Sequence, residues 1–185
     1  IEIVSIATTG DRIKDRPLFL GRQTIHDSLR YGDRFIAVYD QVDQLDISGE
    51  LRYSHDEHIN VQGGIHLFNY GTEDQAQAWN LPIYTINLGA VYDFQDKLLV
   101  KLEAQFNGRR EMPLTVASGW NDLSPAPQST GAPGYVDLFL GLEYRYTKRL
   151  SVFLECSNLS ASKYERWYNY PVQRTLVLGG ASFAF

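Results

Sequence analysis

The stretch YTINLGAVYDFQDKLLVKLEAQF, residues 84–106, decides the fold. It holds two runs in which apolar and other residues alternate, joined by the polar turn Gln95-Asp96-Lys97. Successive side chains of a β-strand point to opposite faces, so each run predicts a strand with one apolar and one more polar face. The short turn between the runs predicts that the two strands pair antiparallel.

The same period of two recurs along most of the chain. It is clear in residues 45–54, 59–67, 136–146 and 150–157, less pure in 174–185, and weak in 1–7. Helical periodicity is nearly absent, and only residues 24–30 predict a short helical turn. The sequence therefore predicts an all-β protein of about eight antiparallel strands.

The connections between these strands alternate in length. Short turns are expected around residues 55–57, 95–97 and 147–149, and long loops over 8–35, 71–81, 111–134 and 159–173. In an antiparallel meander alternate connections lie at the same end, so the short turns share one end and the long loops the other. This arrangement is typical of up-and-down transmembrane β-barrels in bacterial outer membranes.

Composition excludes several other classes of protein. The net charge of −5 comes from 17 basic and 22 acidic residues spread along the chain, which disfavours a nucleic-acid partner. The sequence contains no run of about 18 apolar residues, so it predicts no transmembrane helix. Cys156 is the only cysteine, so no intrachain disulfide can form. We find neither a nucleophile elbow nor a phosphate-binding loop, and we expect no enzyme activity and no cofactor.

Aromatic residues suggest which way the apolar face points. Six of them fall on that face near the short turns: Tyr53, Tyr92, Phe94, Tyr144, Tyr146 and Phe185. An apolar ring with a polar tip suits the interface between lipid and water. A soluble all-β binding module with its apolar face turned inward shows the same alternation and stays open as an alternative.

Charged residues mark the opposite face, where a hydrated lumen would let opposite signs pair. They are Glu50, Arg52, Lys101, Glu103, Glu143, Arg145 and Glu155. The lumen interpretation also accounts for the carboxylates of Glu103 and Glu143 better than acid–base catalysis does.

The long loops hold the candidate ligand contacts. Arg166, Trp167, Tyr168 and Tyr170 lie close together in sequence, and Trp79 and Trp120 in two other loops are expected to join them. Aromatic rings with an arginine can stack on flat ligands or sugars and hold a carboxylate. A self-packed surface loop is the alternative. His55 and His58 flank two acidic residues, but a solvated turn explains them better than a metal site.

The last third of the chain resembles the closing strands of TonB-dependent outer-membrane receptors. Three features carry the resemblance: Asn158-Leu159 followed by Lys163-Tyr164, the Tyr- and Pro-rich loop through Pro171, and the terminal strand from Leu178-Gly179-Gly180 to Phe185. Similarity to the preceding strand pairs extends it back to about Tyr39. It does not include the opening residues or the 111–134 loop.

The resemblance implies a receptor in the bacterial outer membrane that binds and imports a nutrient ligand. It also implies a barrel of about twenty-two strands filled by an N-terminal plug. Partners would be outer-membrane lipid, a TonB-type energy-coupling protein that acts through an upstream region, and the barrel-insertion machinery, which would read Phe185. Residues 1–185 would then be the C-terminal part of the barrel, without a plug domain. The alternative is a complete eight-stranded barrel with a structural or adhesive role.

Overall fold

The chain is almost entirely β-structure. The computed structural model describes residues 2–26, 29–117, 128–167 and 170–185, and all regular secondary structure in these ranges is strand. Ten strands form one sheet and two short strands form another. Within the described ranges there is no helix with the length and apolarity needed to cross a membrane.

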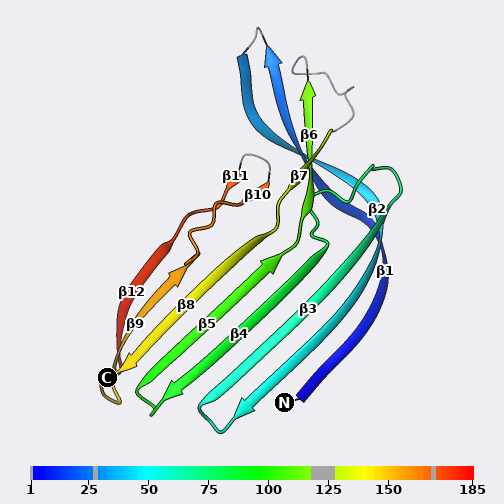
Figure 1. Ribbon diagram of the computed structural model, residues 1–185. Helices are drawn as coiled ribbons and strands as arrows, with labels where there is room; N and C mark the ends of the chain where they lie inside the picture. The colour runs from blue at the N-terminus through cyan, green and yellow to red at the C-terminus, as the bar shows by residue number, and fades with distance from the viewer. Residues whose placement is uncertain (1, 27–28, 118–127, 168–169) are drawn as a thin grey trace.

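Eight long strands form a single antiparallel sheet in the order β12-β9-β8-β5-β4-β3-β2-β1 (Figure 1). Strands that follow one another among these eight lie next to each other and run antiparallel. Their bounds are β1 (Glu2–His26), β2 (Leu29–His55), β3 (Ile59–Thr72), β4 (Tyr84–Phe94), β5 (Leu98–Asn107), β8 (Tyr135–Arg145), β9 (Leu150–Ser157) and β12 (Leu176–Phe183). The predicted all-β, up-and-down order of eight strands is confirmed.

The turns that join β2 to β3, β4 to β5 and β8 to β9 all lie at one end of the sheet, as predicted, and the long connections lie at the other (Figure 1). We call these the short-turn end and the outer end. In the β4–β5 turn Gln95 and Asp96 have φ of 54° and 57°, and the amide of Lys97 donates to the carbonyl of Phe94 at 3.1 Å. Positive φ at both central residues is the type I′ geometry that matches strand twist.

Residues 8–35 are not the loop that the sequence predicts, because β1 and β2 continue through most of them as a long hairpin. Bulges interrupt the pairing between Ile13 and Arg16 and again between Arg22 and Thr24. Each bulge breaks the period of two, so the alternation disappears from the sequence although the strands persist. The predicted helical turn at 24–30 is also wrong, because Ile25 pairs with Arg30 across the hairpin.

Two other predicted loops contain short strands. The 111–134 segment includes most of β6 (Arg110–Ala117) together with β7 (Gln128–Ala132), which pair antiparallel, and β6 also pairs in parallel with the outer part of β1. The 159–173 segment forms the small hairpin of β10 (Glu165–Trp167) and β11 (Tyr170–Pro171). Both additions lie at the outer end (Figure 1).

The eight-stranded sheet is open. In the described residues β12 pairs only with β9, and β1 pairs with β2 and, at its outer part, with β6. The two edges leave rows of main-chain groups without partners, which a closed barrel would not do. In the described residues the eight strands therefore form an open wall.

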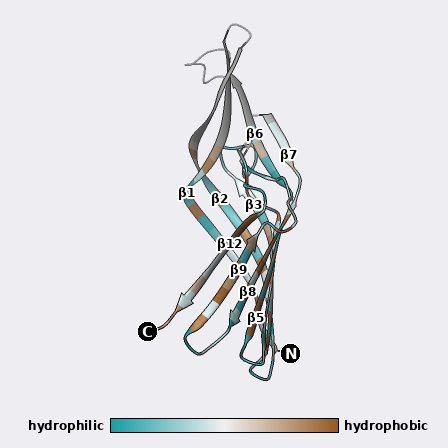
Figure 2. Ribbon diagram, turned by 90° about the vertical axis from the view of Figure 1, so that its left-hand side faces the viewer, coloured by the Kyte–Doolittle hydropathy of each residue, from teal (hydrophilic) through white to brown (hydrophobic). Residues whose placement is uncertain are grey.

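No element of the described chain covers the apolar face of this wall. Leu45, Ile47, Leu88, Leu102 and Leu154 are each 40–49% exposed. Figure 2 shows the lower part of the wall nearly edge-on, without a second layer beside it. A soluble β-sandwich would bury such a face against another sheet.

The small buried core lies on the polar side of the wall, at the outer end. Leu18 and Val42 are 1% and 0% exposed, and the loop after β3 packs Trp79 against them. This contact folds residues 73–83 over the outer end of the sheet.

Candidate functional site

The β10–β11 hairpin overhangs a cavity of about 420 Å³ at the outer end, which we call the outer pocket. Tyr164, Arg166, Trp167 and Tyr170 line it together with Arg174, which approaches from the start of the closing strand. The structure thus brings three predicted ligand contacts, Arg166, Trp167 and Tyr170, to one cavity.

Asn158 holds both ends of the segment that builds this pocket. Its side chain is 4% exposed, and its Nδ2 donates to the carbonyls of Ser162 and Gln173, each at 3.0 Å. Its Oδ1 accepts from the amide of Ser162 at 3.1 Å. One side chain therefore ties Ser162 and Gln173, near the two ends of this segment, together. This gives a structural reason for the Asn158 motif on which the sequence resemblance partly depends.

Tyr164 anchors the hairpin to the wall. Its hydroxyl donates to Oδ2 of Asp137 on β8 at 2.8 Å, and its ring stacks on Tyr135 with centroids 3.7 Å apart. Burial, reinforced by the hydrogen bond to Asp137, raises the pKa of Tyr164 to about 12. The phenol therefore stays protonated as a donor over the whole physiological range of pH.

The chemistry of the outer pocket combines aromatic faces with positive charge. Trp167 packs edge-on against Phe19 of β1, with ring centroids 5.0 Å apart. Arg166 and Arg174 are exposed, and the carboxylate of Asp137 is engaged by Tyr164. Such a site can stack on a flat group and hold an acidic one.

Trp79, another predicted ligand contact, lies apart from this pocket. Its indole is 2% exposed within the small core, and its Nε1 donates to Oε1 of Gln75 at 3.2 Å. A ligand reaches it only if the 73–83 loop opens. The remaining two predicted contacts, Tyr168 and Trp120, lie outside the described residues.

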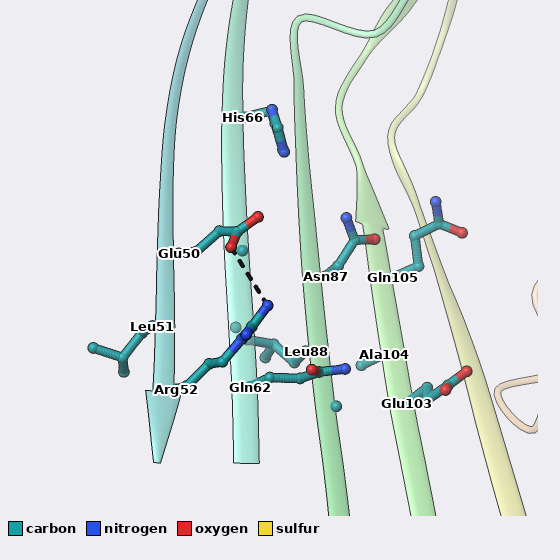
Figure 3. A pocket seen from close by; sticks show the side chains of 13 residues that line it. Glu50, Leu51, Arg52, Gln62, His66, Asn87, Leu88, Glu103, Ala104 and Gln105 are labelled. Atoms are coloured by element: carbon teal, nitrogen blue, oxygen red, sulfur yellow. Dashed lines mark ion pairs between the residues drawn. The ribbon is translucent and has the colours of Figure 1, made fainter. Parts of the chain in front are cut away.

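A second cavity, the inner pocket, lies on the polar face of the wall (Figure 3). It exists because Gly64 on β3 and Gly89 on β4 present no side chain there. Gly64 pairs with Glu50 and Asn87, and Gly89 with Gln62 and Glu103, so polar side chains surround the two gaps. In Figure 3 these side chains project on one side of the sheet, while Leu51 points away.

The charged residues predicted for this face lie on it and pair mostly within their own strands. Lys101 Nζ is 2.7 Å from Glu103, Arg52 Nη2 is 3.9 Å from Glu50, and Arg145 Nε is 3.7 Å from Glu143. Arg145 also contacts Asp93 at 3.3 Å. Glu155 lies beside them on β9 and makes no ion pair with another described residue. Paired charges of opposite sign fit a sheet face that is in contact with water.

The aromatic residues predicted for the membrane interface lie near the short-turn end. Tyr92, Phe94, Tyr144 and Tyr146 are 42–68% exposed, Tyr53 is partly exposed, and Phe185 is fully exposed. Phe94 and Tyr144 lie on one row of the apolar face, joined through Leu98.

No group of three or more histidine, cysteine, aspartate or glutamate side chains is placed to hold a metal ion within the described part of the chain. His55 and Asp56 form an exposed pair at 3.4 Å in the short turn.

Sequence reasoning missed Arg110 and Tyr135. Arg110 contacts the main chain of the β10–β11 hairpin, and Tyr135 stacks on Tyr164. Arg110 begins β6 one residue before the 111–134 segment that was expected to be a loop, and Tyr135 stands one residue before the alternating run at 136–146. Neither position carries a local signal, because their contacts are made with residues distant in the sequence.

Neither a protein-family model nor a curated protein matches the sequence. Solved structures do match the fold. The pyoverdine outer-membrane receptor FpvA from Pseudomonas aeruginosa PAO1 aligns with 97% of this chain at a TM-score of 0.67 and 16% identity. The ferric-catecholate import receptor Fiu from E. coli K12 aligns with 97% at 0.61 and 17%, and the copper transporter OprC with 96% at 0.63 and 13%.

The chain has the fold of barrel wall from TonB-dependent outer-membrane receptors. It spans 27% of the FpvA chain, 24% of the Fiu chain and 28% of the OprC chain. These receptor chains are therefore several times longer than the 185 residues of this chain. Identities of 13–17% establish the fold alone.

Proposed function

We propose that this chain is part of the barrel wall of a receptor that binds a nutrient ligand at its outer loops and imports it across the bacterial outer membrane. The observation that carries the proposal is the uncovered apolar face, with aromatic residues at the short-turn end and the outer pocket at the opposite end. An apolar sheet face of this size that no described residue covers fits contact with lipid.

In this proposal residues 1–185 form one barrel segment, and its two open edges accept further strands of the receptor. The paired charges and the inner pocket face the lumen, where a plug would lie against them. Phe185 is read by the barrel-insertion machinery, and a TonB-type partner supplies energy through another region of the receptor.

Cysteine labelling in cells tests this topology, with Cys156 replaced by alanine to remove the native thiol. We expect Lys163→Cys at the outer end to react with a membrane-impermeant maleimide in intact cells. Lys148→Cys in a short turn should react only after the outer membrane is permeabilised. Leu102→Cys should be protected and its neighbour Glu103→Cys reactive in lipid vesicles. Equal reactivity of Leu102→Cys and Glu103→Cys would contradict the membrane placement.

The ligand-binding role is tested with three probes taken from the matched structures: ferric pyoverdine, a ferric catecholate and Cu²⁺. Binding is followed by tryptophan fluorescence, and the contribution of Trp167 is the part of the signal that Trp167→Phe removes. The expected result is saturable quenching by one probe class and weaker binding in Arg166→Ala. Arg109→Ala, an exposed arginine that does not line the outer pocket, is the matched control.

A further inference from the structure

Arg110 is a buried cation that contacts the β10–β11 hairpin. Its side chain is 6% exposed, and no carboxylate among the described residues forms an ion pair with it. Burial lowers its pKa, the direction expected when a charged group leaves water. Burying a guanidinium without a counter-ion costs free energy, and hydrogen bonds to the group offset part of that cost.

Those hydrogen bonds go to the main chain of the β10–β11 hairpin. Nη2 of Arg110 donates to the carbonyl of Glu165 at 2.6 Å, and Nη1 donates to the carbonyl of Arg166 at 3.2 Å. A planar fork that binds two successive carbonyls fixes both the position and the direction of β10. Charge-assisted hydrogen bonds of this kind are stronger than neutral ones.

Arg110 also contacts the wall itself, through the aromatic ring of Tyr135 on β8. The guanidinium lies over the ring of Tyr135, 5.0 Å from its centroid. Tyr135 stacks on Tyr164, and Tyr164 donates to Asp137. Arg110 therefore joins β6, β8 and the hairpin through one stacked column.

The hairpin needs such external support. β10 has three residues and β11 has two, and a hairpin of this size is not stable by itself in water. Arg110 is absent from the lining of the outer pocket. Arg166, whose carbonyl it holds, and the next residue, Trp167, are part of that lining.

We propose that Arg110 is a positioning residue: it holds the β10 main chain so that Arg166 and Trp167 face the outer pocket before any ligand arrives. It makes no ligand contact itself. The value of this preorganisation rests on the proposed function, because a prepositioned loop loses less freedom when a ligand binds.

The experiment follows Trp167 by ¹⁹F NMR in the full receptor labelled with 5-fluorotryptophan, with the three tryptophan lines assigned by Trp→Phe variants. Arg110→Ala is expected to shift and broaden the Trp167 line and to leave the Trp79 line in place. Adding ethylguanidinium should restore the Trp167 line, whereas ethylammonium should not, because only the guanidinium reproduces the fork. Arg109→Ala, one residue away and paired with Glu111, should leave both lines unchanged.

An unchanged Trp167 line in Arg110→Ala, an equal effect of Arg109→Ala, or rescue by ethylammonium would overturn the proposal. If Arg110→Ala does not fold, Arg110→Lys replaces it, since lysine keeps the charge and loses the planar fork. It is expected to move the Trp167 line and not the Trp79 line, and an unmoved Trp167 line refutes the role. Because this readout needs no ligand, failure to bind any nutrient would refute the proposed function and leave this result intact.

Discussion

The carboxylate of Asp40 on β2 accepts a hydrogen bond from the main-chain amide of Gln75 at 3.0 Å. Its second oxygen accepts from the amide of Asp74, also at 3.0 Å. Asp40 is 3% exposed, and it lies where the 73–83 loop turns back over the small core. One carboxylate thus fastens the start of that loop to the wall.

Replacing Asp40 with asparagine should loosen this loop. The amide group keeps one acceptor and presents its NH₂ to a main-chain donor, so one hydrogen bond is lost. We expect the free energy of local opening to fall by about 1–2 kcal/mol, measured by hydrogen exchange of the amides of residues 74–81. Asp43→Asn, which alters an exposed pair with Arg12, is the control and should leave those amides unchanged. Equal effects of the two substitutions would show that Asp40 has no special role.

The same carboxylate predicts a dependence on pH. Burial would raise the pKa of Asp40, but backbone hydrogen bonds from Gln75, Asp74, Gln41 and Glu73 together outweigh it, so the pKa is lowered. The folded-state pKa thus lies below the unfolded value of about 3.9. The stabilisation is therefore complete above about pH 4 and is lost as the pH falls through the folded-state pKa. We expect the assigned ¹⁹F line of Trp79 to report loop opening in acid, and Asp40→Asn to remove this transition.

Charge introduced on the apolar face of the wall should destabilise the protein in lipid. Leu102 lies midway along β5 and is 49% exposed in the chain alone. In vesicles we expect Leu102→Arg to lower the free energy of unfolding by about 2–4 kcal/mol in a denaturant titration. Gln105→Arg places the same charge on the polar face of the same strand and should have a much smaller effect. A larger effect of Gln105→Arg than of Leu102→Arg would place the lipid against the polar face.

Gly180 and Phe153 form a cross-strand pair in which the glycine leaves room for the ring. A Cβ at Gly180 would lie 2.7 Å from the Phe153 ring, whereas a Cβ at Gly179 meets only ordinary contacts at 3.6 Å or more. Gly180→Ala should force the Phe153 ring to move and so weaken the pairing of β12 with β9 more than Gly179→Ala does. Gly179→Ala is the matched control on the adjacent residue. Hydrogen exchange of the β12 amides measures both, and equal protection in the two variants would rule out the steric role of Gly180.

Local alternation predicted the part of the fold in which strands run without interruption. From β3 to β5, and again over β8 and β9, every second residue faces the same side, so the number of strands, the faces and the short turns follow from adjacent residues. The bulge between Ile13 and Arg16 breaks this rule, and the outer part of the β1–β2 hairpin was missed for that reason. Beyond the bulge β1 and β2 stay paired with each other, and no local sequence pattern shows that pairing.

The residues of the candidate site were also predicted only in part. Arg166, Trp167 and Tyr170 were predicted together because they are close in sequence, and the outer pocket does bring them together. Trp79 was grouped with them by residue type, but its indole is buried against Leu18 and Val42. Arg110 gave no signal, since its role depends on carbonyls 55 and 56 residues away.

By itself the sequence determined that this protein is a sheet of about eight antiparallel strands with one apolar face, because the direction of a side chain along a strand depends only on its neighbours. Only the tertiary structure decided that the sheet stays open and its apolar face uncovered. It also decided that a buried arginine holds the hairpin of the outer pocket. These features depend on contacts between residues far apart in the chain, where geometry and burial, and not local periodicity, select the partner.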